Sequence, residues 1–202
     1  MRWAAATNNK KKLVELQRIM HSFGVEVISL SSLNIDIDVE ETGKTFAENA
    51  LIKAKAIYVL VNLPCIADDS GLCVDALNGE PGVYSARYAG EHGDDNANNQ
   101  KLLHSLQSVS QEKRTARFVS AVAVVFSSEE HKIFEGMCEG VIGTKAKGDS
   151  GFGYDPLFYV NGISFAEMKD EEKDSISHRA KALQQLKKYL EENNYEEKGQ
   201  IC

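Results

Sequence analysis

The apolar residues in the first part of the chain form one periodic set and two short runs. The periodic set predicts a helix, and the runs predict strands. The helix is predicted where apolar residues recur at intervals of three and four, at Leu13, Leu16, Met20 and Phe23. Gly24 follows as a helix end. A short Ala-rich run at residues 2–6 and an apolar run at 25–30 predict strands on either side. The chain therefore begins as strand, helix and strand.

The second predicted helix opens at a capping motif. Thr45 and Glu48 stand in the S/T-x-x-E spacing, in which each side chain binds the other residue's backbone. Apolar residues from Phe46 to Val61 supply the buried side of this helix. Asn49 and Lys53 are four residues apart and so share a different face.

Further along, the pattern predicts strands and then a helix. A short strand at 65–68 is expected to run into a turn at 69–71. The nearly continuous apolar run at 118–126 is typical of a strand buried on both faces, with 132–142 as its antiparallel partner. A Gly-rich turn within 151–159 leads into another strand, and residues 176–190 predict a long final helix. Helices at both ends with strands between them indicate an α/β fold with a mixed sheet.

The charge balance excludes one class of partner. The 202 residues contain 23 Lys and Arg against 30 Asp and Glu, a net charge of −7. Because a long polyanion is neutralised by a basic surface, binding to a nucleic acid polymer is not expected. A small anion needs only a local cluster of donors. The composition is that of a globular chain, so we expect a single domain over 1–202 with a frayed polar tail at 191–202.

The cysteines and the N-terminus indicate the compartment. Cys65, Cys73, Cys138 and Cys202 form no CxxC pair. We interpret them as small buried residues and one tail thiol, in preference to zinc ligands or disulfides. No signal-peptide stretch and no apolar run of about 18 residues is present. The expectation is a cytoplasmic protein that does not enter a membrane.

Two segments in the first half carry candidate chemistry for an anion and a metal. The run from Thr7 to Lys12 lies where a strand hands over to a helix, and free N–H groups and the helix dipole favour an anion there. The alternative is an N-cap followed by a solvated Lys run. Glu40 and Glu41 offer hard oxygen ligands for Mg²⁺, with Lys53 nearby to balance a phosphate; the alternative is an acidic loop before a capped helix.

Three further segments complete the candidates. Asp68 and Asp69 end a strand, where a carboxylate can hold a metal or take a proton from water; a common turn composition is the alternative. Residues 151–156 expose Phe152 and Tyr154 for stacking on a base, unless they form a turn with core aromatics. Lys173 and 177–179 place donors at the start of the last helix, or else form a solvated charged turn.

In this order, the five segments resemble the inosine/xanthosine triphosphate pyrophosphatases, a Ham1-like family that hydrolyses non-canonical purine nucleoside triphosphates to monophosphate and pyrophosphate. The resemblance extends from Thr7 to about Leu190. Its most specific blocks are ETGKTFAENALIKA, ADDSGLCVDALNGEPGVYSARYAG, GFGYDPLF and SHRAKAL. The family's fold implies a mixed, strongly twisted central sheet flanked by helices, two lobes with an active-site cleft, and commonly a homodimer.

The resemblance also implies a role for each motif. Phosphate and substrate contacts match Thr7, Asn8, Asn9, Lys10, Lys11, Lys12, Lys53 and Ser70, with Asn8 standing where many members have Gly. The Mg²⁺ ligands match Glu41 and Asp69; Glu40 is a possible substitute, and Asp68 is a possible aid to the metal. Asp69 also matches the catalytic residue. The base pocket matches Phe152, Gly153, Tyr154, Asp155, Lys173, His178 and Arg179.

The implied reaction is Mg²⁺-assisted attack of water on the α-phosphorus of a small-molecule triphosphate such as ITP, dITP or XTP. Asp69 orients or deprotonates the water, while Lys12 and Lys53 offset the growing negative charge. Donors such as Arg179 favour the 6-oxygen of hypoxanthine or xanthine over the 6-amino group of adenine. Two other functions stay open: a pyrophosphatase of modified or pyrimidine triphosphates, and a non-catalytic nucleotide-binding module.

Overall fold

A computed structural model describes residues 1–195 of the chain. The elements follow one another as β1 (Arg2–Ala5), α1 (Lys10–His21), β2 (Glu26–Ile28), α2 (Phe46–Val61), β3 (Cys65–Val74), α3 (Asp95–Ser105), β4 (Thr115–Val125), β5 (His131–Ile142), β6 (Phe158–Val160), β7 (Ile163–Ser164), α4 (Asp170–Ile176) and α5 (His178–Glu192). Short 3-10 turns lie at Ser31–Leu33, Asp75–Leu77, Gly82–Arg87, Gln111–Lys113 and Phe165–Glu167.

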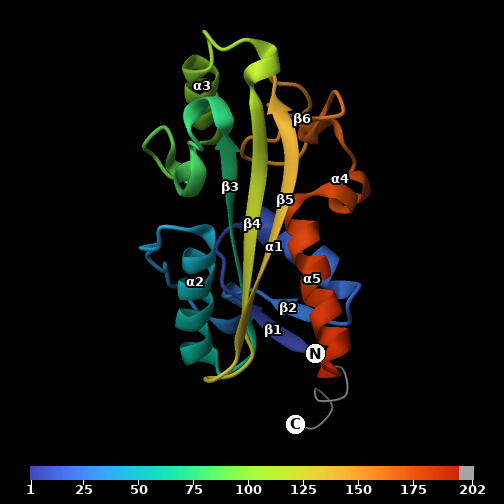
Figure 1. The fold of residues 1–202 in the computed structure, drawn as a ribbon. Helices are drawn as coiled ribbons and strands as arrows, with labels where there is room; N and C mark the ends of the chain where they lie inside the picture. Colours follow the sequence, from blue (N-terminus) through green and yellow to red (C-terminus); the bar gives the residue numbers. More distant parts are fainter. Residues whose placement is uncertain (196–202) are drawn as a thin grey trace. The chain divides into compact units, whose positions relative to one another are not determined.

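The strands form one mixed sheet, which confirms the expected α/β fold (Figure 1). Their order is β2-β1-β3-β4-β5-β6-β7. β1 pairs in parallel with both β2 and β3, whereas β6 pairs antiparallel with β5 and β7. β4 and β5 are neighbours in the sheet, as the sequence predicted, and the turn between them is closed by a bond from the Phe126 N–H to the Glu130 carbonyl of 2.9 Å.

The chain divides into two compact units. The first comprises residues 1–69, 120–136 and, within the described part, 179–195; the second comprises 70–119 and 137–178. The two lobes implied by the family resemblance stay a prediction. The cleft expected between them stays a prediction.

In the first unit, apolar side chains cover both faces of the strands. Trp3 and Ala5 of β1 belong to the cluster formed with α1 and α5, whereas Ala4 and Ala6 belong to the cluster formed with α2. Figure 1 shows these helices on opposite sides of the strands. The alternation follows from the two-residue period of a strand. It decides which helix each successive residue of a strand meets.

The helix ends in this unit follow the local sequence. The Asn9 side chain caps α1 by accepting from the N–H groups of Lys11 and Lys12. Thr45 and Glu48 form the expected capping box at the start of α2. Gly24 has a φ of +72°, a left-handed conformation that glycine adopts without a steric penalty. Local side-chain chemistry therefore fixes where α1 and α2 begin.

The second unit has its own core of aromatic and aliphatic residues. Phe118 of β4 contacts Phe158 and Phe165, with ring centroids 4.7 and 5.9 Å away. Leu102 of α3 and Leu157 are fully buried in the same cluster. This core packs α3 against β4 and the segment around β6. Because Leu157 belongs to it, the core fixes the C-terminal end of the 151–157 loop.

The structure differs from the sequence expectations in β3, in α3 and α4, and at the C-terminal end. The expected turn at 69–71 is wrong, because β3 continues without interruption to Val74. α3 and α4 were not expected, since α3 is rich in Asn and α4 is short and charged. The frayed tail does not begin at 191, because α5 continues to Glu192 and Tyr195 packs on Phe126 with ring centroids 4.7 Å apart. The remainder of that tail lies outside the described residues.

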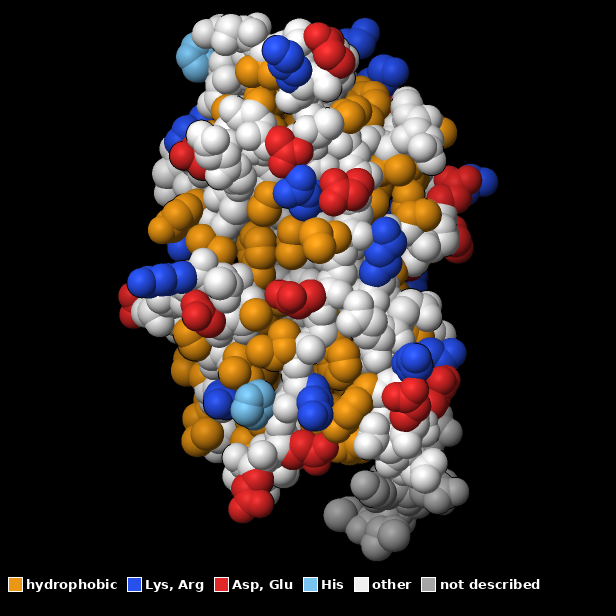
Figure 2. All heavy atoms as spheres, viewed as in Figure 1, with side chains coloured by type: hydrophobic (Ala, Val, Ile, Leu, Met, Phe, Trp, Pro, Cys, Tyr) orange, Lys and Arg blue, Asp and Glu red, His pale blue; other side chains and the backbone are white. Residues whose placement is uncertain are grey.

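Three of the four cysteines lie within the described residues. Cys65 and Cys138 are buried and Cys73 is half-buried, all as free thiols, while Cys202 lies outside the described residues. Within residues 1–195, no helix combines the length and the apolar character needed to cross a bilayer. On the face shown in Figure 2, acidic and basic side chains are interspersed and no broad basic patch is visible.

Candidate active site

Two adjacent carboxylates on β3 form the centre of the candidate site in the first unit. Ile66 faces the α1 and α5 side of the sheet, and Ala67 faces α2. Continuing the alternation, Asp68 faces α1 and α5, whereas Asp69 faces α2. Each carboxylate is thereby surrounded by a different set of partners.

Asp68 is held by three side chains and has no solvent-exposed side-chain surface. Its Oδ2 lies 2.9 Å from Arg179 and 3.0 Å from the Nζ of Lys12, and its Oδ1 accepts from the Ser120 hydroxyl at 2.5 Å. Burial opposes ionisation, but the charges of Arg179 and Lys12 outweigh it and hold the pKa of Asp68 well below its usual range. Arg179 also pairs with Glu15 of α1. Asp68 is therefore a fixed anion that orients two cations.

Asp69 belongs to a second group, formed with α2 and the loop before it. Its Oδ2 accepts from the Asn49 side chain at 3.2 Å, and its Oδ1 lies 3.2 Å from the Nζ of Lys53. The same Nζ is 2.6 Å from Glu41 and also donates to the Asp68 carbonyl at 3.0 Å. Two carboxylates, Glu41 and Asp69, thus converge on one positive charge. Glu40 is exposed, so the structure favours Glu41 over Glu40 as the inward-facing acid.

The charges in this group shift each other's ionisation. Burial raises the pKa of Asp69, and Lys53 and Lys12 offset only part of that rise. Burial disfavours the Lys53 ammonium, but Asp69 and Glu41 outweigh this and raise the pKa of Lys53. Lys53 therefore stays charged, while Asp69 becomes a stronger base than an exposed aspartate.

The loop carrying Glu41 is anchored to the same helix. The Gly43 N–H donates to Asn49 Oδ1 at 2.8 Å, and a Cβ built at Gly43 would lie only 2.6 Å from that oxygen. Asn49 is almost fully buried. Its amide therefore binds the acidic loop on one side and Asp69 on the other.

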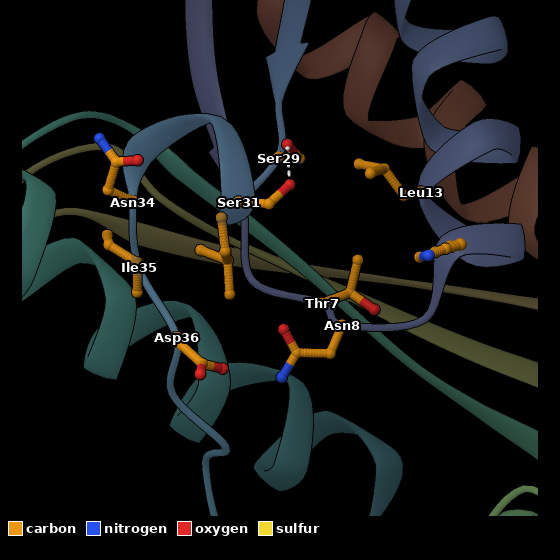
Figure 3. A pocket seen from close by; sticks show the side chains of 10 residues that line it. Thr7, Asn8, Leu13, Ser29, Ser31, Asn34, Ile35 and Asp36 are labelled. Atoms are coloured by element: carbon orange, nitrogen blue, oxygen red, sulfur yellow. Dashed lines mark hydrogen bonds between the residues drawn. The ribbon is translucent and has the colours of Figure 1, made fainter.

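The Thr7 to Lys12 segment is divided between two surroundings. Lys12 reaches Asp68, whereas Thr7, Asn8 and Lys10 line a pocket of about 480 Å³. Figure 3 shows Thr7 and Asn8 facing Ser31 and the 35–36 segment across this pocket. Asn9 caps α1, and Lys11 is exposed. Lys12 therefore joins the carboxylate group through Asp68.

In the second unit, the residues expected at the base form a tightly bonded loop. Asp155 Oδ2 accepts from the Phe152 N–H at 2.9 Å and from the Lys173 Nζ at 2.8 Å. Lys173 is buried and lies 5.2 Å from the centre of the half-buried Phe152 ring. His178 is buried and stacks on Phe118, with ring centroids 4.8 Å apart. Lys173, Asp155 and Phe152 are therefore brought together, and His178 packs on the core beside β4.

Three of the expected site residues have surroundings that the motifs did not indicate. Tyr154 was expected to be exposed for stacking, but it is buried and its hydroxyl donates to the Ser85 carbonyl at 2.9 Å. Arg179 was expected to donate to the base; its terminal nitrogens contact the carboxylates of Glu15 and Asp68. Ser70 is half-buried within β3 and does not lie in a turn.

The comparison with known proteins decides the family. The model of the Ham1 family matches residues 3–189. The chain belongs to the Ham1 family. A dITP/XTP pyrophosphatase of Halalkalibacterium halodurans is 49% identical over 191 residues, which cover 94% of this chain and 98% of that protein. A dITP/XTP pyrophosphatase of Listeria innocua serovar 6a is 51% identical over 189 residues and covers 93% of each.

A solved structure agrees with this family. The Ham1 protein of Staphylococcus aureus is 44% identical, has a TM-score of 0.84, and covers 96% of this chain and 100% of that chain. At this identity the likeness supports the family as well as the fold. The family indicated by the sequence motifs is thus confirmed.

Sequence reasoning missed two members of the charged group in this Ham1-family chain. Glu15 follows Lys12 by three residues and precedes Ile19 by four, so helical spacing alone places it on the buried face of α1. That position was the available signal. Ser120 carries no such signal, because a serine inside an apolar strand is common. Its partner, Asp68, is 52 residues away in the chain.

Proposed function

We propose that this chain hydrolyses non-canonical purine nucleoside triphosphates (dITP, ITP and XTP) to the nucleoside monophosphate and pyrophosphate. The observation that carries the proposal is the convergence of Glu41 and Asp69 on the Lys53 ammonium, with Lys12 held beside them by Asp68. Carboxylates for a metal and ammonium groups for phosphates are the two charges that this reaction needs. The relatives' name, dITP/XTP pyrophosphatase, supports the choice of substrate.

The donor set fits Mg²⁺. Glu41 and Asp69 already place carboxylate oxygens within 2.6 and 3.2 Å of a single cationic nitrogen, and proteins commonly hold Mg²⁺ by one or two carboxylates together with phosphate oxygens and water. When bound, Mg²⁺ supplies Lewis-acid stabilisation of the polyphosphate charge. Glu41 and Asp69 would hold it, and Lys53 would then be available to a phosphate.

The chain's own residues accept the proton, stabilise the developing charge and position one another. Asp69, whose pKa is raised by burial, orients a water and accepts its proton as the oxygen bonds to the α-phosphorus. The bond from that phosphorus to the bridging oxygen breaks, and pyrophosphate leaves. Lys12 and Lys53 stabilise the negative charge that develops on the phosphate oxygens. Asp68 positions Lys12, and Arg179 positions Asp68.

For the second unit, we propose that the loop at 152–155 contacts the purine. The partial exposure of Phe152 supports stacking of its ring on a base, and the Lys173 contact with Asp155 supports a fixed loop conformation. Tyr154 and His178 contribute packing beneath this loop, in place of the direct contacts that the motif suggested. Gly153 supplies a backbone that can approach a ligand closely.

Three further properties are part of the proposal. The substrate is a small molecule, and the net charge of −7 speaks against a nucleic acid polymer as partner. The chain is proposed to act as a homodimer in the cytoplasm. Size-exclusion chromatography with light scattering tests the dimer, and a mass of about 22 kDa would contradict it, since one chain has a mass of 22.3 kDa.

A product assay tests the function. Pyrophosphate and monophosphate release are measured for ITP, dITP, XTP, GTP, ATP and UTP, with Mg²⁺ and with a chelator. Rapid release from the first three and its loss with chelator are expected. A preference for UTP or for modified bases would replace the proposal by a different pyrophosphatase. Tight nucleotide binding without release from any triphosphate would replace it by a binding module.

A further inference from the structure

Two side chains of α3, in the second unit, bind the backbone N–H and the carbonyl of Gly153. Asp95 and Asn99 of α3 are four residues apart and so lie on the same face of the helix. The Gly153 N–H donates to Asp95 Oδ2 at 2.8 Å, and the Gly153 carbonyl accepts from Asn99 Nδ2 at 2.8 Å. The two contacts fix the peptide groups on both sides of this glycine.

The helix that makes these contacts is itself anchored. Asn98, almost fully buried, accepts from the Ala89 N–H at 2.7 Å and donates to the Ala86 carbonyl at 3.3 Å. Leu102, one turn further along, is fully buried in the core of the same unit. α3 therefore does not move freely with the loop, and a contact from Asp95 or Asn99 restrains the loop against a fixed support.

The loop needs such restraint at this residue. Gly153 has a φ of +60°, and glycine loses more conformational freedom on folding than any other residue. The neighbouring restraint, from Asp155 to the Phe152 N–H, acts one residue earlier. The peptide between Phe152 and Gly153 also accepts from the Asp155 N–H, at 3.2 Å. Loss of the contacts from α3 would weaken the restraint on both peptides that flank Gly153 and so loosen the segment that carries the Phe152 ring.

We propose that Asp95 and Asn99 are positioning residues that set base selectivity by clamping Gly153. This inference rests on the proposed function, in which the 152–155 loop contacts the purine. Neither residue needs to touch the nucleotide. They act by holding the Phe152 ring and the adjacent backbone groups in one geometry, and a misplacement of about 1 Å can cost about 100-fold in rate.

Exchanging Asp and Asn at these two positions is expected to have opposite effects on the contacts with Gly153. In Asp95→Asn, a side-chain oxygen remains to accept from the Gly153 N–H, so the clamp is retained. In Asn99→Asp, the donor is lost and a carboxylate faces the carbonyls of Gly153 and Asp95, both of which Asn99 Nδ2 contacts at 2.8 Å. Asn96→Asp is the matched control, because it adds the same charge to an exposed position of the same helix.

The test combines kinetics with hydrogen exchange on the full chain. For Asn99→Asp we expect kcat/KM for ITP to fall about 10- to 100-fold, mainly through KM, and the preference for ITP over ATP to shrink by about tenfold. Asp95→Ala is expected to lower the same two quantities, and Asp95→Asn is expected to retain them. Asn96→Asp is expected to have the kcat/KM and the selectivity of the unmodified chain. Exchange of the Gly153 amide is expected to accelerate in Asp95→Ala and Asn99→Asp alone.

The outcomes distinguish a failure of the positioning role of Asp95 and Asn99 from a failure of the proposed function. Unchanged selectivity in both Asn99→Asp and Asp95→Ala, with an active enzyme, would overturn the clamp and leave the proposed function in place. Equal losses in Asn96→Asp and Asn99→Asp would show that added charge, and not the lost donor, is responsible, and would also overturn it. An unmodified chain that releases pyrophosphate from no triphosphate would overturn the proposed function and the selectivity role with it. Asp95→Ala covers the case in which Asn99→Asp does not fold.

Discussion

Among the described residues, Arg179 and Arg117 each contact two carboxylates. Arg179 is buried, whereas Arg117 is partly exposed. Arg179 is 1% exposed and pairs with Glu15 and with Asp68, the latter at 2.9 Å. Arg117 pairs with Asp75 at 2.7 Å and with Glu139 at 3.2 Å, and the side chains of these three residues are 34%, 44% and 69% exposed. Replacing either arginine by methionine removes contacts with two carboxylates. At Arg179 these contacts lie in the protein interior, and at Arg117 they lie beside solvent.

The expected losses of stability differ several-fold. Arg179→Met leaves Glu15 and Asp68 as buried carboxylates with less compensation, and breaking a buried pair in this way costs about 3–5 kcal/mol of unfolding free energy. For a chain of this size the melting temperature should fall by roughly 10 °C. Arg117→Met should cost less than about 1 kcal/mol, because water and salt screen exposed pairs.

Equilibrium unfolding in urea measures both variants under identical conditions. A second substitution, Glu15→Gln in the Arg179→Met background, removes one of the uncompensated charges and should recover part of the loss. Equal losses for the two arginine variants would refute the reasoning, because burial would then not decide the outcome. A further loss on adding Glu15→Gln would show that the side chain's packing, and not its charge, is what Arg179 contributes.

Three further outcomes are expected. Asp69→Asn should reduce pyrophosphate release by orders of magnitude with little change in melting temperature; near-normal turnover would remove Asp69 from the catalytic role. Gly151→Ala should lower stability by about 1–3 kcal/mol in urea unfolding, since its φ is +75° and the added Cβ would overlap the Asp155 carboxylate; an unchanged midpoint would contradict this. Burial raises the pKa of Cys65 to about 12, so this thiol should resist a thiolate-directed reagent at pH 8 while the half-buried Cys73 reacts faster; faster labelling of Cys65 would be the contrary result.

The Cys65 pKa also gives a sign for the dependence of stability on pH. The unfolded thiol ionises near pH 9, whereas the buried thiol stays neutral up to about pH 12. The stabilisation associated with the neutral thiol is therefore complete below pH 9 and is lost as pH rises through that interval. Cys65→Ala should weaken this alkaline decline in urea unfolding, and an unchanged decline would show that Cys65 does not contribute to it.

Local sequence determined the elements whose signals lie within one turn or one strand. Thr45 and Glu48 fixed the start of α2 through a capping box that needs no distant partner. Gly24 ended the first helical segment for a similarly local reason. The order of the motifs was also enough to indicate the family, since each motif is read along the chain. α3 was missed because its Asn-rich sequence carries little apolar periodicity and its stability comes from contacts such as Asn98 to the 86–89 backbone.

Tertiary structure alone decided what each charged side chain does. The sequence placed Asp68 and Asp69 side by side, but strand alternation sends one to Arg179 and the other to Lys53, partners 111 and 16 residues away. Arg179 stands in a base-pocket motif, yet its terminal nitrogens contact Glu15 and Asp68. An ion pair depends on distance and burial in space, and neither is recorded by spacing along a chain. Residue types therefore determined which chemistry was available, and the packing of strands against helices decided which groups meet.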